Sequence, residues 1–408
     1  MELSKLSKSV RAKLRAKVLE NIFIGNDVVE LIEEEFVHSE FKVVYPMDDI
    51  YDLSTEDHIT LFNNCTKQFL PYIKNIYIEN PSSHYYLIEL SNSLSNLTSL
   101  AIYGSKLSLS GFNTVLNNLQ GLENLVIDSV YFIQYSEEGD LAKSVKLHTS
   151  LKYLVWKYCY IEKCCLQEDP QLIDFDYDGY INERSTIYFD LDHYPKLNYI
   201  STVSRNPPFN IEFLLTNPQI NWLDYRLEKL NQDTITIFNA IQNIEILELE
   251  VAYLDFNLNS INLQLPNLKR LYMHNVSIKT WSILKKLSLS SPNLIELYFD
   301  ITGYVLPPIL DTINSILSLK KLTITSQNSM YFHFDDFSVS KSLEYFELCF
   351  EINIDLALSI LEKYPNLNTF CIHDKYFDRG YILTVDQENT TKPWILTKMG
   401  ELIKYNKI

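Results

Sequence analysis

Glycine is scarce in this chain, with 9 residues in 408, and the two closest glycines, Gly104 and Gly111, are seven positions apart. This spacing excludes the phosphate-binding motifs GxGxxG and GxxxxGKS/T and the nucleophile elbow GxSxG, because each needs closer glycines. No stretch approaches about 18–20 consecutive apolar residues, so we expect no membrane span. The first residues lack the apolar core and the cleavage site of a signal peptide. We therefore expect a protein of the cytoplasm, the nucleus or both.

Residues that hold metals or perform catalysis are few and dispersed. The six cysteines form no CxxC pair, and the eight histidines form no HExxH motif. The densest group of thiols, Cys159, Cys164 and Cys165, has no fourth zinc ligand nearby and is more typical of packing. Carboxylates are so numerous that no pair can be assigned as acid and base. We therefore predict no catalytic residue, no metal and no cofactor, and we expect reduced cysteines.

Positive charge is also in short supply. The chain has 35 Lys and Arg against 52 Asp and Glu, for a formal net charge of −17. Such a chain repels phosphate backbones and anionic lipid. The charge balance therefore predicts that neither nucleic acid nor membrane is a partner, and it favours a basic protein or peptide.

A repeat dominates what the sequence does contain. The stretch LPNLKRLYM at 265–273 returns as SPNLIELYF at 291–299 and YPNLNTFCI at 364–372, with the shared form L-x-x-L-x-L. Most copies begin about 24 residues after the previous one, which is a leucine-rich repeat period. The first apolar residue of each copy marks the register, and these markers are Ile73, Leu97, Leu122, Leu151, Leu197, Ile220, Ile244, Leu268, Leu294, Leu319, Leu343 and Leu367.

One interval, from Leu151 to Leu197, is about twice as long as the others. The stretch QLIDFDYDG at 171–179 fits a further copy, in which the apolar positions are Leu172, Phe175 and Tyr177. A strand would turn the alternate residues outward, namely Asp174, Asp176 and Asp178. Their spacing also matches the start of an EF-hand, but loop position 12 needs a glutamate and falls on Ser185. We predict a repeat unit here and no dedicated calcium site.

Segments with helical apolar spacing lie between the copies, among them 111–120, 233–243, 281–290, 308–318 and 355–364. Each unit is therefore predicted to be a strand followed by a helix, which buries its apolar side only against its neighbours. The pattern resembles the ribonuclease-inhibitor-like leucine-rich repeat proteins over about residues 70–375. The resemblance implies an α/β solenoid, a horseshoe with a curved parallel sheet on the concave face and helices on the convex face.

The first residues form a second pattern. Residues 3–22 are typical of a basic amphipathic helix, in which one face carries Leu3, Leu6, Val10 and Leu14. One interpretation is a cap on the first repeat. The stretch LSKLSKSVRAKL also resembles the last helix of an F-box, L-S-x-V-C-K-x-W-R-x-L, although Val10 stands where tryptophan is usual and the upstream LP-x-E half is absent. The resemblance implies that these four residues contact a Skp1-type adaptor of a cullin (SCF) ubiquitin ligase.

These patterns predict three regions. Residues 1–50 form an N-terminal helical cap or residual F-box-like segment, with an atypical strand at 40–45. Residues 51–375 hold roughly 13 repeats, entered by a helix at 54–69. Residues 376–408 form a C-terminal cap, in which KPWILTKMGELIKY is expected to be a helix over the last unit.

The residues between the apolar strand positions should face outward on the concave side. Aromatic side chains recur there in unit after unit, and acids outnumber bases. Tyr and Trp are enriched at binding hot spots, and acids around them would steer a basic partner; the 28 tyrosines of the chain also allow the row to arise from composition alone. The predicted partner-binding set is Tyr199, Trp222, Asp224, Arg226, Glu248, Glu250, Arg270, Tyr272, His274, Glu296, Tyr298 and Asp300.

The sequence thus predicts a protein-interaction module and no enzyme. The favoured function is an F-box-type substrate receptor that binds its target on the concave face. The alternatives are a leucine-rich repeat scaffold without a ubiquitin role, and a regulator of another enzyme on the same fold.

Overall fold

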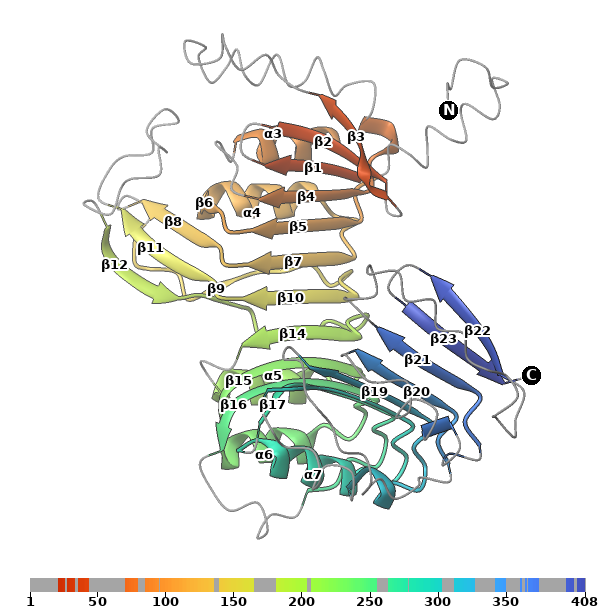
Figure 1. Cartoon of the computed structure of the whole chain (residues 1–408). Coiled ribbons are helices and arrows are strands. Elements are labelled where there is room, and N and C mark those ends of the chain that lie inside the picture. Colours follow the sequence, from red (N-terminus) through yellow and green to blue (C-terminus); the bar gives the residue numbers. More distant parts are fainter. Residues whose placement is uncertain are drawn as a thin grey trace, which may run out of the picture. The chain divides into compact units, whose positions relative to one another are not determined.

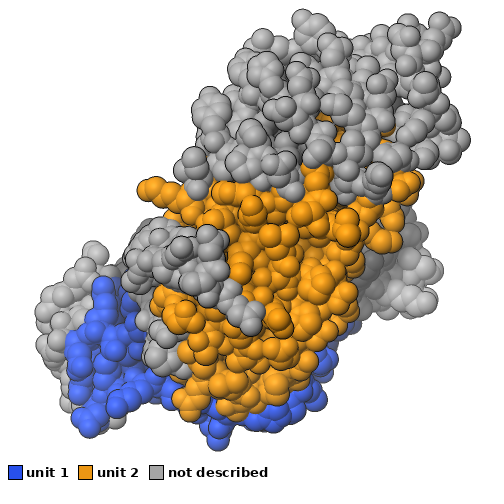
Figure 2. All heavy atoms as spheres, turned by 90° about the horizontal axis from the view of Figure 1, so that it is seen from below, with its two compact units in different colours: residues 1–203 blue, residues 204–408 orange. Residues whose placement is uncertain are grey.

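The computed structural model describes residues 21–25, 28–33, 36–43, 70–79, 85–94, 96–135, 139–164, 181–203, 207–254, 263–277, 279–302, 312–326, 342–349, 360–361, 364, 366–373, 394–399 and 402–407. The chain divides into two compact units, unit 1 (residues 1–203) and unit 2 (residues 204–408), which Figure 2 colours separately. Each unit is built on a mainly parallel sheet with helices on one face (Figure 1).

The helices of unit 1 are the single 3₁₀ turn η3 Leu70–Tyr72, α3 Tyr85–Ser93 and α4 Leu109–Asn118. Its strands are β1 Asn21–Gly25, β2 Val28–Glu33, β3 Phe36–Val43, β4 Asn75–Glu79, β5 Ser99–Tyr103, β6 Lys106–Ser108, β7 Asn124–Asp128, β8 Tyr131–Tyr135, β9 Ser144–Val145, β10 Tyr153–Lys157, β11 Tyr160–Cys164, β12 Ile181–Thr186, β13 Tyr188–Phe189 and β14 Tyr199–Val203. The main sheet has the parallel order β1–β4–β5–β7–β10–β14.

The start of this sheet is an antiparallel meander of β1, β2 and β3. The strand predicted at 40–45 overlaps β3. The described part of the predicted N-terminal cap, within 21–43, is therefore strand and not helix, in keeping with the β-branched and aromatic residues of VVELIE and FVHSEFKV. The helix predicted at 3–22 lies outside the described residues except for Asn21 and Ile22, which belong to β1, and the helix predicted at 54–69 lies outside them altogether.

Unit 1 also contains a second sheet, in the order β12–β11–β8–β6. A two-residue connection leads from a main-sheet strand into each of its strands β6, β8 and β11, and the first residue of each connection has left-handed backbone: Gly104 (φ 54°), Ser129 (φ 59°) and Tyr158 (φ 51°). The sequence predicts a helix after every repeat strand, and this is wrong after β7 and β10. There YFIQY and YIEKC bury Phe132 and Ile161 in the alternating pattern of a strand.

The described residues of the long interval between Leu151 and Leu197 add no further strand to the main sheet between β10 and β14. β10 pairs directly with β14, and Tyr153 lies opposite Tyr199. A repeat strand at 172–177 would have to lie between these two, so the prediction of an additional unit is wrong. The three aspartates 174, 176 and 178 lie outside the described residues.

The described helices of unit 2 include α5 Pro207–Thr216, α6 Gln232–Ala240 and α7 Trp281–Leu289, and residues 312–315 are also helical. Its strands are β15 Trp222–Leu230, β16 Ile246–Leu254, β17 Arg270–Val276, β18 Glu296–Ile301, β19 Lys321–Ser326, β20 Tyr345–Cys349, β21 Thr369–His373, β22 Trp394–Met399 and β23 Leu402–Lys407. β15 to β21 are parallel and follow sequence order. The helices α4, α6 and α7 confirm three of the predicted helical segments.

The end of unit 2 is a β-hairpin, not the predicted helix. β22 and β23 are antiparallel, and β23 extends the sheet by pairing with β21. Met399 lies opposite Leu402, which leaves two residues in the loop, and the first of them is Gly400. A two-residue loop that begins with glycine is a hairpin signal that outweighs the helical spacing of this stretch.

The core confirms the repeat register. All of the marker residues are buried, from Ile73 to Leu367, and so are the alternate residues of each repeat strand, such as Leu271 and Met273 of β17. The L-x-x-L-x-L side chains, which are the marker and the two inward residues of each repeat strand, are thus buried beneath the main sheet. Burial of a leucine in this way contributes about 1.5–3 kcal/mol. Both units are therefore segments of a leucine-rich repeat solenoid.

A ladder of side-chain hydrogen bonds joins successive repeats at the residue before each marker. Asn243, Asn267 and Asn293 donate through Nδ2 to the carbonyls of Pro218, Gln242 and Pro266, at 2.9, 2.7 and 2.7 Å. Where this position is serine, the shorter side chain reaches the previous marker itself: Ser318 Oγ donates to Leu294 O at 2.7 Å. The recurrent Pro-Asn and Ser before the repeat motif thus connect one unit to the next.

We expect Asn293→Ala to lower the free energy of unfolding of unit 2 by about 1 kcal/mol, because it leaves the Pro266 carbonyl without this donor. Asn293→Ser should retain most of the stability, since serine serves at the same position in the next repeat. Urea denaturation followed by fluorescence measures both. Equal losses in the two variants would contradict the ladder.

Candidate functional site

The sheet face of unit 2 opposite the helices carries the predicted site. We call it the open face and define it by the outward residues of β15 to β20, namely Trp222, Asp224, Arg226, Ile246, Glu248, Glu250, Arg270, Tyr272, His274, Glu296, Tyr298, Asp300, Lys321, Thr323, Thr325, Tyr345, Glu347 and Cys349. They alternate with the buried leucines along every strand.

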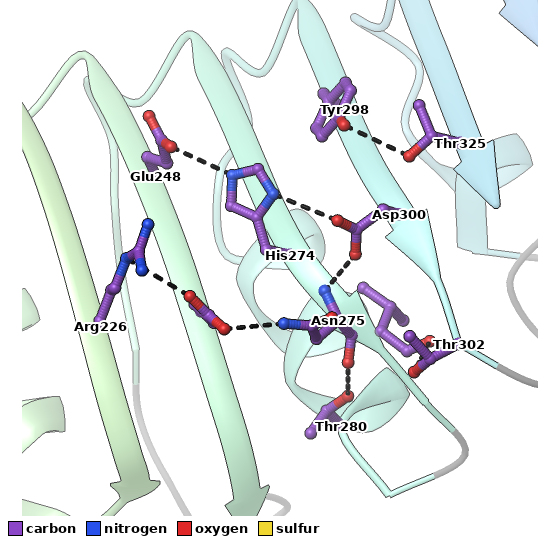
Figure 3. A network of polar contacts seen from close by, with 11 residues as sticks. Arg226, Glu248, His274, Asn275, Thr280, Tyr298, Asp300, Thr302 and Thr325 are labelled. Carbon is purple, nitrogen blue, oxygen red and sulfur yellow. Dashed lines mark hydrogen bonds and ion pairs between the residues drawn. The ribbon is translucent and has the colours of Figure 1, made fainter. Parts of the chain in front are cut away.

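A histidine joins three neighbouring strands at the centre of this face. His274 of β17 contacts Glu248 of β16 through Nε2 at 3.1 Å and Asp300 of β18 through Nδ1 at 3.3 Å (Figure 3). Both ring nitrogens therefore lie against carboxylates. Such an arrangement suits an imidazolium, which donates from both nitrogens.

The two carboxylates hold the proton on this ring. Hydrogen bonds that the ring donates to Asp300 and Glu248 raise the pKa of His274 from 6.5 to about 9, against the opposing effect of burial. His274 is consequently a cation at neutral pH. Two negative charges that would otherwise repel each other across β17 are thereby bridged by a positive one.

A bulge at the end of β17 adds a second layer to the network. Asn275 has left-handed backbone (φ 56°), and the pairing of β17 with β18 shifts register between Met273 and Val276. Its backbone N–H donates to Asp300 Oδ1, and its Nδ2 donates to Glu250 Oε1 at 2.7 Å (Figure 3). Asparagine tolerates this backbone better than most residues, so the bulge turns two donors toward carboxylates.

Cations on neighbouring strands contact two more carboxylates of this face, those of Glu250 and Glu296. Glu250 Oε2 lies 3.4 Å from Arg226 Nε. On the next strands, Glu296 lies between Arg270 Nε at 3.4 Å and Lys321 Nζ at 2.7 Å. The open face is therefore a lattice of alternating charges that runs across the strands.

Aromatic residues line the same face. The ring centroids of Tyr272 and Tyr298 are 5.9 Å apart, and Tyr298 Oη is 3.2 Å from Thr325 Oγ1. Burial raises the pKa of Tyr272, Tyr298 and Tyr345, so these phenols stay neutral and can donate. Trp222 is 36% exposed at the first strand. Large amphipathic rings beside satisfied charges are typical of binding surfaces.

The structure brings most of the predicted site residues together, with two exceptions. Tyr199 belongs to unit 1, where it is buried and stacks on Tyr153 with ring centroids 4.0 Å apart. Asp224 lies on the open face but is only 6% exposed. Neither residue offers a surface to a partner in the way that the repeat pattern suggests. Whether the other residues bind a partner stays a prediction.

Sequence reasoning missed Asn275, Lys321 and Thr325. Lys321 and Thr325 sit at the outward positions of LKKLTITS, so the repeat register alone could have found them. Asn275 gave no such signal, because it follows the strand pattern and acts through a bulge. The predicted adaptor contacts Leu3, Leu6, Val10 and Leu14 lie outside the described residues.

The described residues contain no cluster of three or more His, Cys, Asp or Glu side chains placed to hold a metal ion. Within the same part of the chain, none of the helices has the length and apolar character needed to cross a bilayer.

Comparison with known proteins finds similarity at the level of structure only. No protein-family model matches the chain, and no curated protein matches it. Two solved structures are similar in fold: the TLR13–ssRNA13 complex, at 15% identity and a TM-score of 0.32 over 73% of this chain and 45% of that one, and internalin InlF of Listeria monocytogenes, at 13% identity and a TM-score of 0.32 over 77% and 87%. The chain thus spans less than half of the TLR13 chain.

The fold is a leucine-rich repeat solenoid. The similarity to the two solved structures is too low to support this assignment. The fold is shown by the chain's own repeats, namely the buried markers, the parallel strands at a period of about 24 residues and the side-chain hydrogen bonds between successive repeats.

Proposed function

We propose that this protein is a non-enzymatic interaction module that binds a protein target on the open face of unit 2. The observation that carries the proposal is the bridge from Glu248 through His274 to Asp300, which fixes charged side chains across three strands. Side chains that are already held in place lose little entropy when a partner binds. A sheet that exposes Trp222 and partly exposes Tyr272 and Tyr298 around this bridge offers the rigid aromatic area that hot spots use.

The same bridge argues against a role for this histidine as a general base. A general base must be unprotonated at working pH, whereas His274, with a pKa of about 9, keeps its proton at neutral pH. Its two nitrogens are also both occupied by carboxylates of the same face. The ring therefore serves as a structural cation.

Within this function, we propose the more specific role of an F-box-type substrate receptor of a cullin (SCF) ubiquitin ligase. Its support is the sequence resemblance of LSKLSKSVRAKL, and its adaptor contacts would be Leu3, Leu6, Val10 and Leu14. The alternative is a scaffold, or a regulator of an enzyme, that binds its target on the same face without any adaptor.

Affinity purification of the full chain with quantitative mass spectrometry tests both levels. We expect Trp222→Ala to reduce target recovery at least about tenfold, because exposed tryptophans dominate binding energy. The matched control is Trp281→Ala, a partly exposed tryptophan on α7, which should leave recovery within about twofold. Equal recovery from both variants would refute binding on the open face.

The same mass spectrometry experiment detects an adaptor that is bound to the chain. We expect a Skp1-type protein and a cullin among the recovered proteins, and we expect Leu6→Asp with Leu14→Asp to remove them while the target remains. A target recovered without any adaptor would favour the scaffold or regulator over the ligase receptor.

A further inference from the structure

We propose that the open face of unit 2 selects an acidic segment of its partner protein, rich in hydrogen-bond acceptors, and that Arg270 and Lys321 of this face bind its carboxylates. The inference rests on the proposed function, since it names the partner chemistry of the same surface. It reverses the basic partner that the amino-acid composition predicts.

The carboxylates of the face already have partners, including Glu347, which accepts from Thr323 Oγ1 and Tyr345 Oη. Glu250 accepts from Asn275 and pairs with Arg226, Asp300 accepts from Asn275 and His274, and Glu296 lies between two cations. Glu248 contacts the charged ring of His274. A basic partner would have to displace these internal donors, and displacement of satisfied, partly buried pairs is costly.

The cations lie further out than the carboxylates that they contact. The side chains of Arg226, Arg270 and Lys321 are 46%, 50% and 43% exposed. The carboxylates of Glu296 and Asp300 are only 15% and 17% exposed, and the main-chain and side-chain atoms of Asp224 together are 6% exposed. A partner therefore meets N–H donors first. A guanidinium has five of them, and those of Arg270 contact Glu296 through Nε and also Tyr272.

The spacing of the cations suits an extended chain. Arg270, Glu296 and Lys321 occupy one register position on β17, β18 and β19. Two strand spacings separate Arg270 from Lys321, which is about 10 Å. A polyproline-II segment advances about 3.1 Å per residue with three residues per turn, so acidic residues three positions apart lie on one face and cover about the same distance. An acidic segment in this conformation that runs across the sheet can thus place one carboxylate on each cation.

The net charge of the chain does not oppose this selection at contact. The charge of −17 is spread over the whole chain, and fields between exposed charges are screened beyond about 8 Å at physiological salt. The affinity is therefore determined by the charged groups that the partner contacts. The overall charge affects mainly the rate of approach and its dependence on salt.

A random phage-displayed peptide library panned on the full chain tests the inference. We expect the enriched peptides to carry more Asp and Glu than Lys and Arg, with acids three positions apart. Arg270→Gln combined with Lys321→Gln should weaken an enriched acidic peptide at least about tenfold in fluorescence polarisation. The matched control is Lys285→Gln, an exposed lysine on α7, which should change the affinity less than about twofold.

The outcomes distinguish a failure of the acidic-partner inference from a failure of the proposed function. Enriched peptides that are basic, and whose binding is lost in the Trp222→Ala variant, would overturn the acidic partner and leave the proposed function standing. Peptides that bind the Trp222→Ala variant as tightly as the wild type would overturn the proposed function as well. A single-stranded RNA oligonucleotide that competes as effectively as the acidic peptide would overturn the choice of a protein segment.

Discussion

Leu271→Ala should lower the free energy of unfolding of unit 2 by about 3 kcal/mol. Leu271 is the second residue of β17, is fully buried, and is the third leucine of LPNLKRLYM. Loss of its side chain leaves a cavity between the sheet and the helices that the neighbouring repeats cannot close. For a unit of this size we expect the thermal midpoint to fall by roughly 6–12 °C, measured by calorimetry or circular dichroism.

A second leucine of the same unit provides the control. Leu317 is 86% exposed, and Leu317→Ala should change the free energy of unfolding by less than about 0.5 kcal/mol. A small effect of Leu271→Ala, similar to that of Leu317→Ala, would contradict the assignment of the L-x-x-L-x-L leucines to a common core.

His274→Gln should remove a pH-dependent part of the stability of unit 2. The folded pKa of about 9 lies above the ordinary value of 6.5, so the folded state holds the proton more tightly than the unfolded state. This stabilisation is fully present below pH 6.5 and is lost as the pH rises through 9. We expect about 1–2 kcal/mol, after allowing for solvent screening of a side chain that is 30% exposed.

The difference in unfolding free energy between wild type and His274→Gln, measured from pH 6 to pH 10, isolates this contribution. We expect the difference to be largest near pH 6 and to shrink toward zero by pH 10. His193→Gln, at an exposed histidine of unit 1, controls for the loss of a histidine as such and should change the unfolding free energy by less than about 0.5 kcal/mol. A flat difference for His274→Gln, or one that grows with pH, would show that the ring is not a bridging cation.

The repeat architecture could be predicted because it depends on a signal that every unit repeats. Markers such as Leu268 and Leu294 recur in phase and are all buried. What the spacing could not decide was the conformation between the strands. YFIQY and YIEKC form strands of a second sheet, because a left-handed residue after the main strand turns the chain into a new pairing. Such a turn depends on Ser129 and Tyr158, which are not glycine and give little warning.

In two other segments, residue spacing alone also failed to predict which strands pair. In the interval before Leu197, apolar residues at the right spacing suggested another unit, but spacing alone does not show which strands pair, and β10 pairs with β14. At the end of the chain, helical spacing competed with the hairpin signal of Gly400, and the sheet edge at β21 favours pairing with β23.

For the candidate site, the sequence placed the residues well but not their interactions. The alternation of strands put Glu248, His274 and Asp300 on one face, as the register of β16 to β18 confirms. The composition of that face suggested an acidic surface. The structure instead shows that these acids have partners on the same face and that Arg270 and Lys321 are more exposed than the Glu296 that they contact, and this depends on side-chain length and on the bulge at Asn275.

Site-specific photo-crosslinking in cells would show whether a partner protein contacts the open face of unit 2. A benzoyl-phenylalanine placed at Tyr272 on the open face should form a covalent adduct with a partner protein, and the same residue at Trp281 on α7 should not. If the adduct forms only from position 281, or from neither position, then the open face of unit 2 is not where this protein binds its target.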